Sequence, residues 1–128
     1  MAKWRDGGGW LRSGQVEVEL EVATSYRART RGLLGRDGIE GALLLTPAGS
    51  VHTFRMRFPI DVAYLDRTFR VVAMTTMPPN RLGLPRFRSR HVLEAEAGAM
   101  AGWGLRVGGL VELRQDQGQA GPGAPGQV

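Results

Sequence analysis

The chain of 128 residues contains no cysteine. This absence excludes disulfide bonds, thiolate metal ligands and a cysteine nucleophile. The chain also lacks any uninterrupted apolar run of about 18 residues, the length that a membrane-spanning helix needs. The basic start MAKWRDGGGW is not followed by the apolar stretch of a secretory signal. We therefore expect a cytoplasmic protein by default, with no membrane span.

Lysine is almost missing as well, because one lysine stands against sixteen arginines in a chain with a formal net charge of +5. Such a bias fits an effect of nucleotide composition on codon usage at least as well as it fits any function, so the charge alone does not indicate a nucleic acid partner. The length suits one domain with a single core. We expect a monomer.

What the chain does contain is short runs in which apolar and polar residues alternate, as in half-buried strands. Strands are predicted over residues 15–22, 39–45, 51–58, 60–66, 68–77, 91–97 and 105–113, with a short turn or one-turn helix over 98–104. One short helix is predicted from Tyr26 to Leu34, with Thr24-Ser25 as its N-cap and Gly35 as its C-cap.

These elements predict a mainly β fold, an antiparallel β sandwich or barrel-like single domain with one short helix. The domain is expected to occupy residues 15–114. Residues 1–14 are glycine-rich and predict a flexible leader, and residues 115–128 are rich in Gly, Pro and Gln and predict a disordered tail.

The stretch VHTFRMRFPIDVAYLD (residues 51–66) is the centre of this prediction. Alternation over 51–58 places His52 on an apolar face with three large side chains, which are Phe54, Met56 and Phe58. Pro59 removes a backbone donor and predicts a corner, after which Asp61 begins the next strand.

Three segments together resemble a known family. RTRGLLGR (29–36), VHTFRMRFPIDVAYLD (51–66) and VLEAEAGAMAGWGLRVGGLVEL (92–113) are similar, in order and spacing, to the motifs of the bacterial and archaeal domain of unknown function 192 (DUF192). The resemblance implies a mainly β, sandwich-like fold and brings no established activity. Where the family often ends in Gly-Asp, this chain has Gly108-Gly109, so any role of that aspartate is missing.

The candidate ligand pocket consists of Arg36, His52, Asp61 and Glu94. Here Arg36 would clamp an anion, Asp61 would orient it, and His52 would donate a hydrogen bond or exchange a proton. The competing interpretation is structural: Arg36 ties the end of the helix to Asp61, and His52 is a satisfied core residue.

Three functions follow from these residues. The first is an accessory binding module for a small polar ligand, a glycan or a partner protein segment. The second is an undescribed enzyme that uses His52 and Asp61 as an acid–base pair. Metal assistance would draw on His52, His91, Asp61 and Glu94, but these lack metal-ligand spacing, so we expect no metal and no cofactor. The sequence favours binding over catalysis.

The third function is polyanion binding through an arginine-rich face. Its residues would be Arg55, Arg57, Arg86, Arg88 and Arg90, with Phe87 available for stacking on bases. The acidic strip of strand 15–22 and the lack of any recognised binding motif disfavour nucleic acid.

Overall fold

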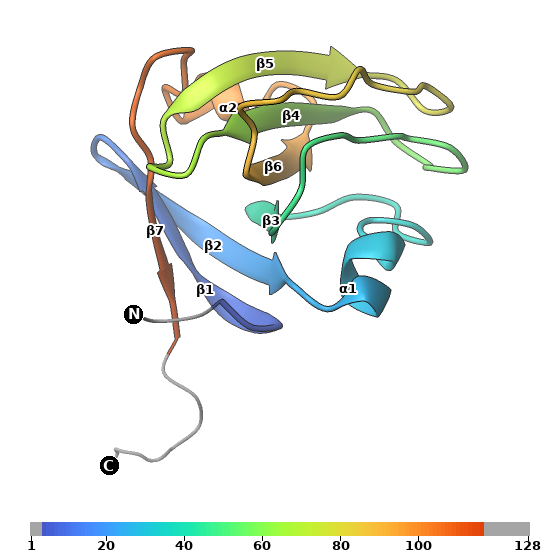
Figure 1. Ribbon diagram of the computed structural model, residues 1–128, viewed down its shortest axis with the longest axis horizontal. Helices are drawn as coiled ribbons and strands as arrows, with labels where there is room; N and C mark the ends of the chain where they lie inside the picture. Colours follow the sequence, from blue (N-terminus) through green and yellow to red (C-terminus); the bar gives the residue numbers. More distant parts are fainter. Residues whose placement is uncertain (1–3, 117–128) are drawn as a thin grey trace.

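Seven strands form one sheet in the order β5-β4-β6-β3-β2-β1-β7 (Figure 1). The computed structural model describes residues 4–116. All neighbouring strands run antiparallel except β2 and β3, which run parallel. The strands are β1 (Gly7–Ser13), β2 (Val16–Ala23), β3 (Ala42–Leu45), β4 (Ile60–Leu65), β5 (Val71–Met77), β6 (His91–Glu96) and β7 (Glu112–Gln115).

The sheet curls until its two edges meet. Arg70, just before β5, forms a bridge with Leu110, just before β7. The Val71 amide donates to the Gly109 carbonyl at 2.9 Å, and the Gly108 amide donates to the Val71 carbonyl at 2.8 Å. Pairing at this corner removes part of the exposed edge that an open sheet would leave. The prediction of a mainly β, barrel-like single domain is therefore confirmed.

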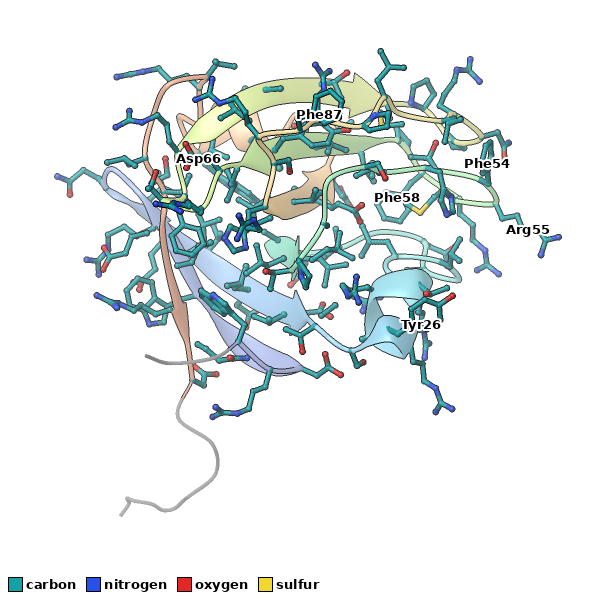
Figure 2. The ribbon with its side chains drawn as sticks, in the orientation of Figure 1. Tyr26, Phe54, Arg55, Phe58, Asp66 and Phe87 are labelled. Carbon is teal, nitrogen blue, oxygen red and sulfur yellow. The ribbon has the colours of Figure 1, made fainter. Side chains whose placement is uncertain are left out.

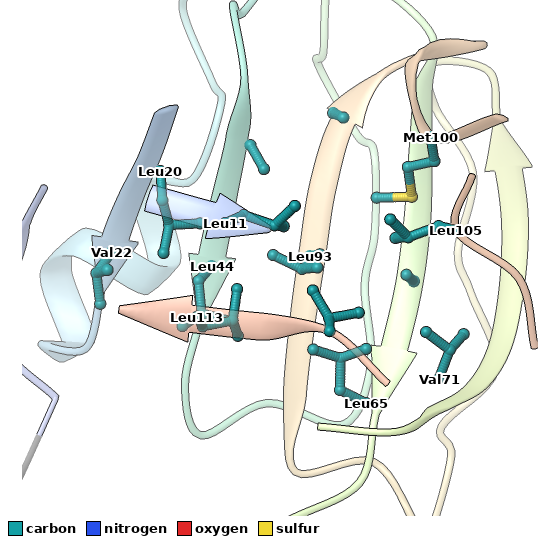
Figure 3. Packing of buried hydrophobic residues seen from close by; sticks show 14 residues of the cluster. Leu11, Leu20, Val22, Leu44, Leu65, Val71, Leu93, Met100, Leu105 and Leu113 are labelled. Atoms are coloured by element: carbon teal, nitrogen blue, oxygen red, sulfur yellow. The ribbon is translucent and has the colours of Figure 1, made fainter. Parts of the chain in front are cut away.

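Each face of the sheet carries its own core because side chains alternate along every strand. One core includes Leu11, Leu44, Leu65, Leu93 and Met100 (Figure 3). The other lies on the opposite face of β3, β4 and β6, beneath α1 and the loop after β3. It includes Leu33, Leu43, Val62, Tyr64 and Val92.

The predicted helix is present but shorter. Helix α1 spans Tyr26–Arg31, and the Ser25 hydroxyl caps it by accepting from the Ala28 amide at 3.1 Å. It ends at Gly32 (φ 47°), three residues before the predicted cap at Gly35, because glycine tolerates this left-handed conformation. A second helix, α2 (Ala99–Gly102), follows β6, so the described part of the chain contains two short helices instead of one. Neither helix within residues 4–116 has the length and apolar character needed to cross a membrane.

The prediction of a flexible leader over residues 1–14 is wrong for Gly7–Ser13, which form β1 and pair with both β2 and β7. Its glycines have a packing role: a Cβ on Gly9 would collide with the backbone carbonyl of Arg114 in β7. A glycine-rich segment can therefore be a central strand where a neighbouring backbone approaches closely. Of the predicted tail, Gln115 belongs to β7, and residues 117–128 lie outside the described part of the chain.

The prediction of a strand over 51–58 is also wrong, because the only ladder contact there is a bridge between His52 and Leu82. Thr53 is fully buried and holds this loop to the loop after β5: its amide donates to the Arg81 carbonyl at 2.8 Å, and its hydroxyl donates to the Pro78 carbonyl at 2.6 Å. Arg55 has φ 66°, which interrupts the extended backbone. The buried residues are consequently Val51, Thr53, Met56 and Phe58, whereas His52 and Phe54 face solvent.

Candidate functional site

A cavity of about 540 Å³ lies between α1 with the turn that follows it (residues 26–34), the loop after β3 (47–52) and the start of β6. Figure 1 shows α1 at one end of the sheet. The size falls in the range of small-molecule sites. The arginine, histidine and glutamate side chains that line it are Arg29, Arg31, His52, Arg90 and Glu94.

Glu94 is the buried acid of this cavity. It lies on β6 opposite Leu43 of β3 and Val62 of β4, and it is only 6% exposed. Among residues 4–116, no arginine or histidine nitrogen lies within 4.0 Å of its carboxyl oxygens, and no donor hydrogen-bonds to them. Burial raises the pKa of Glu94 to about 7 because the ionised form loses its hydration.

Four other buried polar side chains, Thr46, Thr53, Asp61 and His91, do have partners. The Thr46 hydroxyl lies 2.7 Å from Nδ1 of His91, and Thr53 bonds to two backbone carbonyls. Asp61 accepts three hydrogen bonds, as described below. Glu94 is thus an exception to the rule that buried polar groups are satisfied within the fold.

Histidine 52 lies at the mouth of the cavity and not in the core. Its ring stacks on Phe54 with centroids 5.1 Å apart, and Nδ1 accepts a hydrogen bond from the Phe54 amide at 3.4 Å. Figure 2 shows Phe54 and Arg55 at the end of the molecule that also carries Tyr26 of α1. The prediction that His52 lies on an apolar face is therefore wrong, but its association with Glu94 in one cavity is observed.

The predicted contact between Arg36 and Asp61 does not exist. Arg36 instead forms a two-pronged ion pair with Glu21 of β2, with N–O distances of 2.7 and 2.8 Å. The hydrogen bonds from Arg36 hold the pKa of Glu21 below its usual value. Arg36 does not line the Glu94 cavity. The predicted tie between the end of the helix and a carboxylate is real, but the wrong carboxylate was chosen.

Asp61 lies on the opposite face of the sheet from Glu94. In the register of β4 with β6, Val62 faces Glu94 and Asp61 faces Ala95, so the two carboxyl groups alternate across the sheet. Its carboxylate accepts from the Gly98 and Met100 amides at 2.9 and 3.1 Å and from the Thr76 hydroxyl at 2.7 Å. Asp61 thus fastens the start of α2 to the sheet. Two of the four predicted pocket residues, His52 and Glu94, therefore share the cavity. Arg36 is paired with Glu21, and Asp61 is a structural carboxylate.

The candidate metal ligands do not come together in one group. Among residues 4–116, no three His, Asp or Glu side chains form a group that could hold a metal ion. His91, one of the four ligands considered, is enclosed by Thr46 and by the ring of Phe69, which stacks on it at 4.6 Å. Burial, assisted by the charge of Arg90, lowers the pKa of His91 to about 4. It is therefore a neutral core residue at physiological pH.

Comparison with known proteins fits this architecture. The model of the family described as DUF192, an uncharacterised ACR, matches residues 10–113. This chain belongs to the DUF192 family.

The DUF192 domain is 34% identical to UPF0127 protein PH1112 of Pyrococcus horikoshii, over 64% of this chain and 76% of that protein. It is 28% identical to UPF0127 protein PYRAB11210 of Pyrococcus abyssi, over 79% of this chain and 91% of that one. A crystal structure of a protein of unknown function from Novosphingobium aromaticivorans has the same fold, with a TM-score of 0.68 and 20% identity over 82% of this chain and 83% of that one. The family is uncharacterised, so function must be argued from the site.

The arginines considered for polyanion binding are spread over the surface of the DUF192 domain. Arg57 pairs with Asp37 at 3.2 Å, Arg86 lies over the ring of Tyr64, and Arg90 lines the Glu94 cavity. Arg55 and Arg88 are exposed. In Figure 2, Phe87 lies well apart from Phe54 and Arg55. Three of the five arginines are therefore in contact with different parts of the domain.

Sequence reasoning missed Arg29 and Arg31 as cavity residues. Both belong to the motif RTRGLLGR (residues 29–36), but neither was included in the candidate pocket. The sequence did contain a signal for Arg29. This first arginine of the motif lies in the same segment as the cap Ser25, and so short a helix can turn only one side toward the sheet.

Proposed function

We propose that this DUF192 domain is a binding module that takes a small polar ligand into the Glu94 cavity. The observation that carries the proposal is the buried carboxyl of Glu94, which has no partner within residues 4–116 and lies against a cavity large enough for a ligand. A buried polar group without a partner costs free energy, and such exceptions concentrate at sites that serve function.

The arrangement of the other groups supports the same conclusion. The floor of the cavity belongs to the central strands β3 and β6, through Leu45 and Glu94, while its walls come from α1 and two loops. A rigid sheet therefore positions the acid, and adaptable loops surround it. This division is typical of binding sites built on a scaffold.

The enzymatic alternative loses its proposed acid–base pair, because Asp61 lies on the other face of the sheet from the His52 cavity and has three hydrogen-bond donors of its own. Binding needs only the cavity and its polar groups, whereas catalysis by His52 and Asp61 needs both side chains at one substrate. We therefore favour binding.

A ligand screen tests the proposal. Thermal shift and ligand-observed NMR would use separate pools of amino acids, sugars, nucleotides and carboxylic acids with the wild-type domain. We expect at least one pool to raise the melting temperature and to lose that effect in Glu94→Gln. Glu40→Gln is the matched control, because Glu40 is exposed and does not line the cavity. If no pool binds, or if binding survives unchanged in Glu94→Gln, the proposal is refuted.

Polyanion binding is the second candidate, supported by one observation. The loops 49–58 and 78–90 contain no acidic residue and are joined by backbone hydrogen bonds, such as the one from the Gly83 amide to the Val51 carbonyl at 2.8 Å. Arg55 and Arg88 are exposed on them. Binding to a single-stranded oligonucleotide should then weaken steeply with salt and should weaken further in Arg55→Gln. Affinity that is absent, or constant with salt, removes this candidate.

A further inference from the structure

The charges around the Glu94 cavity are divided between its floor and its walls. Glu94 is the only acidic residue that lines it within the described chain, and it lies at the sheet. Three arginines line the walls, which are Arg29, Arg31 and Arg90. The cavity therefore combines one buried carboxyl group at the sheet with several positive groups on its walls.

Arg29 is held in place by backbone oxygens. Its Nε donates to the Thr24 carbonyl at 3.0 Å, and its Nη1 donates to the Pro47 carbonyl at 3.2 Å. These neutral acceptors fix the guanidinium between α1 and the loop after β3 without cancelling its charge. Within residues 4–116, the ion pairs formed do not include Arg29, Arg31 or Arg90.

A ligand with a charge of one sign cannot pair with both the ionised form of Glu94 and the arginines. A simple cation would pair with Glu94 but would meet three arginines on its way to the floor. A simple anion would pair with the arginines but would leave Glu94 buried without a partner. A molecule that carries both charges would match both, since electrostatic complementarity sets which partners a site accepts.

We propose that the ligand of this cavity is a small zwitterion with a free amino acid's pattern of charge. Its ammonium group binds the Glu94 carboxylate at the floor. Its carboxylate faces the arginines of the wall, principally Arg90 and Arg29. This proposal rests on the proposed binding function and specifies its ligand class. The apolar lining, which includes Leu33, Leu45, Val51 and Met56, leaves room for an apolar side chain.

Isothermal titration calorimetry would compare L-leucine with its two halves. Isobutylacetic acid (4-methylpentanoate) keeps the anion, isopentylamine keeps the cation, and glycerol serves as an uncharged probe. We expect L-leucine or another amino acid of a small panel to bind at least about tenfold more tightly than either half, because it alone satisfies both charges. At pH 6, binding should release a proton from Glu94, which appears as heat that depends on the ionisation enthalpy of the buffer.

Two variants locate the charges. Glu94→Gln should lose about tenfold or more in affinity for the amino acid and should abolish the proton release. Arg90→Gln should weaken amino acid binding without weakening binding of the amine, because it removes a positive charge that only the carboxylate needs. The backbone contacts of Arg90 with Ala48 and Leu65 do not depend on the side chain. Arg88→Gln is the matched control, since this exposed neighbour does not line the cavity.

The outcomes separate this proposal from the more general one. If the carboxylate half or glycerol binds as tightly as the amino acid and still needs Glu94, the zwitterion proposal is wrong and the binding function stands. Proton uptake in place of release would likewise overturn it, because Glu94 would then act as a neutral donor. If none of the four probe types, nor any pool of the wider screen, binds, both proposals fall.

Discussion

Replacing Glu94 by Gln should stabilise the domain at high pH, although most substitutions at buried positions destabilise. The reason is that the pKa of Glu94 is about 7 in the folded chain, against 4.5 when its environment is solvent. Between pH 4.5 and about 7, the folded chain therefore keeps a proton on Glu94 that the unfolded chain has released. Stability is highest when Glu94 is protonated in both states, and it falls as pH rises from 4.5 to about 7.

The magnitude follows from that interval. At about 1.36 kcal/mol per pH unit, the ionised chain loses about 3 kcal/mol of its free energy of unfolding by pH 8. Glutamine has nearly the same shape and stays neutral, so it escapes this loss. We expect Glu94→Gln to gain up to about 3 kcal/mol relative to wild type on going from pH 4.5 to pH 8. This change with pH is diagnostic, because a fixed packing difference between the two side chains cancels from it.

Urea denaturation at several pH values, followed by far-ultraviolet circular dichroism, measures the effect. The difference between wild type and Glu94→Gln is the quantity to plot, since every other titrating group contributes equally to both. Glu40→Gln should give a difference that is flat with pH, because Glu40 is exposed. A flat difference for Glu94→Gln as well would refute the reasoning, since it would mean that an undetected partner or water satisfies the carboxylate.

Three other predictions concern neighbouring groups. The pKa of His91 is lowered from 6.5 to about 4, so on acidification the unfolded chain takes up a proton on His91 before the folded chain does. The free energy of unfolding should therefore fall as the pH decreases from 6.5 to about 4, and His91→Gln should lose this pH dependence in the same urea titrations. Asp61→Ala leaves the Gly98 and Met100 amides without their acceptor and should cost about 2–4 kcal/mol of unfolding free energy, whereas Asp37→Ala, at an exposed ion pair, should cost less than about 1 kcal/mol; equal costs would contradict the assigned role of Asp61. His52→Gln should change unfolding free energy by less than about 0.5 kcal/mol yet weaken ligand binding at the cavity mouth, and a large stability loss with unchanged binding would make His52 structural.

Local patterns predicted the parts of the fold that depend on neighbours in sequence. The alternation of Val16 to Val22 gave β2, and Ser25 was recognised as a helix cap from residue type alone. A compact apolar run predicted β3, alternation predicted β4, and the strand character of residues 91–97 predicted β6. Even so, β1 was missed. Gly9 is needed there because the backbone of β7 approaches it closely, and the neighbouring sequence does not reveal that approach.

The candidate site was predicted in part. Of the predicted pocket residues, Glu94 and His52 line one cavity, while Arg36 and Asp61 lie elsewhere. The alternation along β4 already separated Asp61 from Val62, but only the pairing of β4 with β6 reveals which of the two shares a face with Glu94. The exposure of His52 depends on Thr53, whose buried hydrogen bonds reach residues about 25 positions away.

The chain's own sequence determined that this is a cysteine-free, mainly β domain with a capped helix after its first long strand, since periodicity and cap chemistry act over a few residues. Tertiary structure alone decided that Glu94 has no partner among residues 4–116 while Asp61 and Glu21 are satisfied. The physical reason is that charge pairing depends on which strands become neighbours and in which register, and those contacts join residues that are distant in sequence.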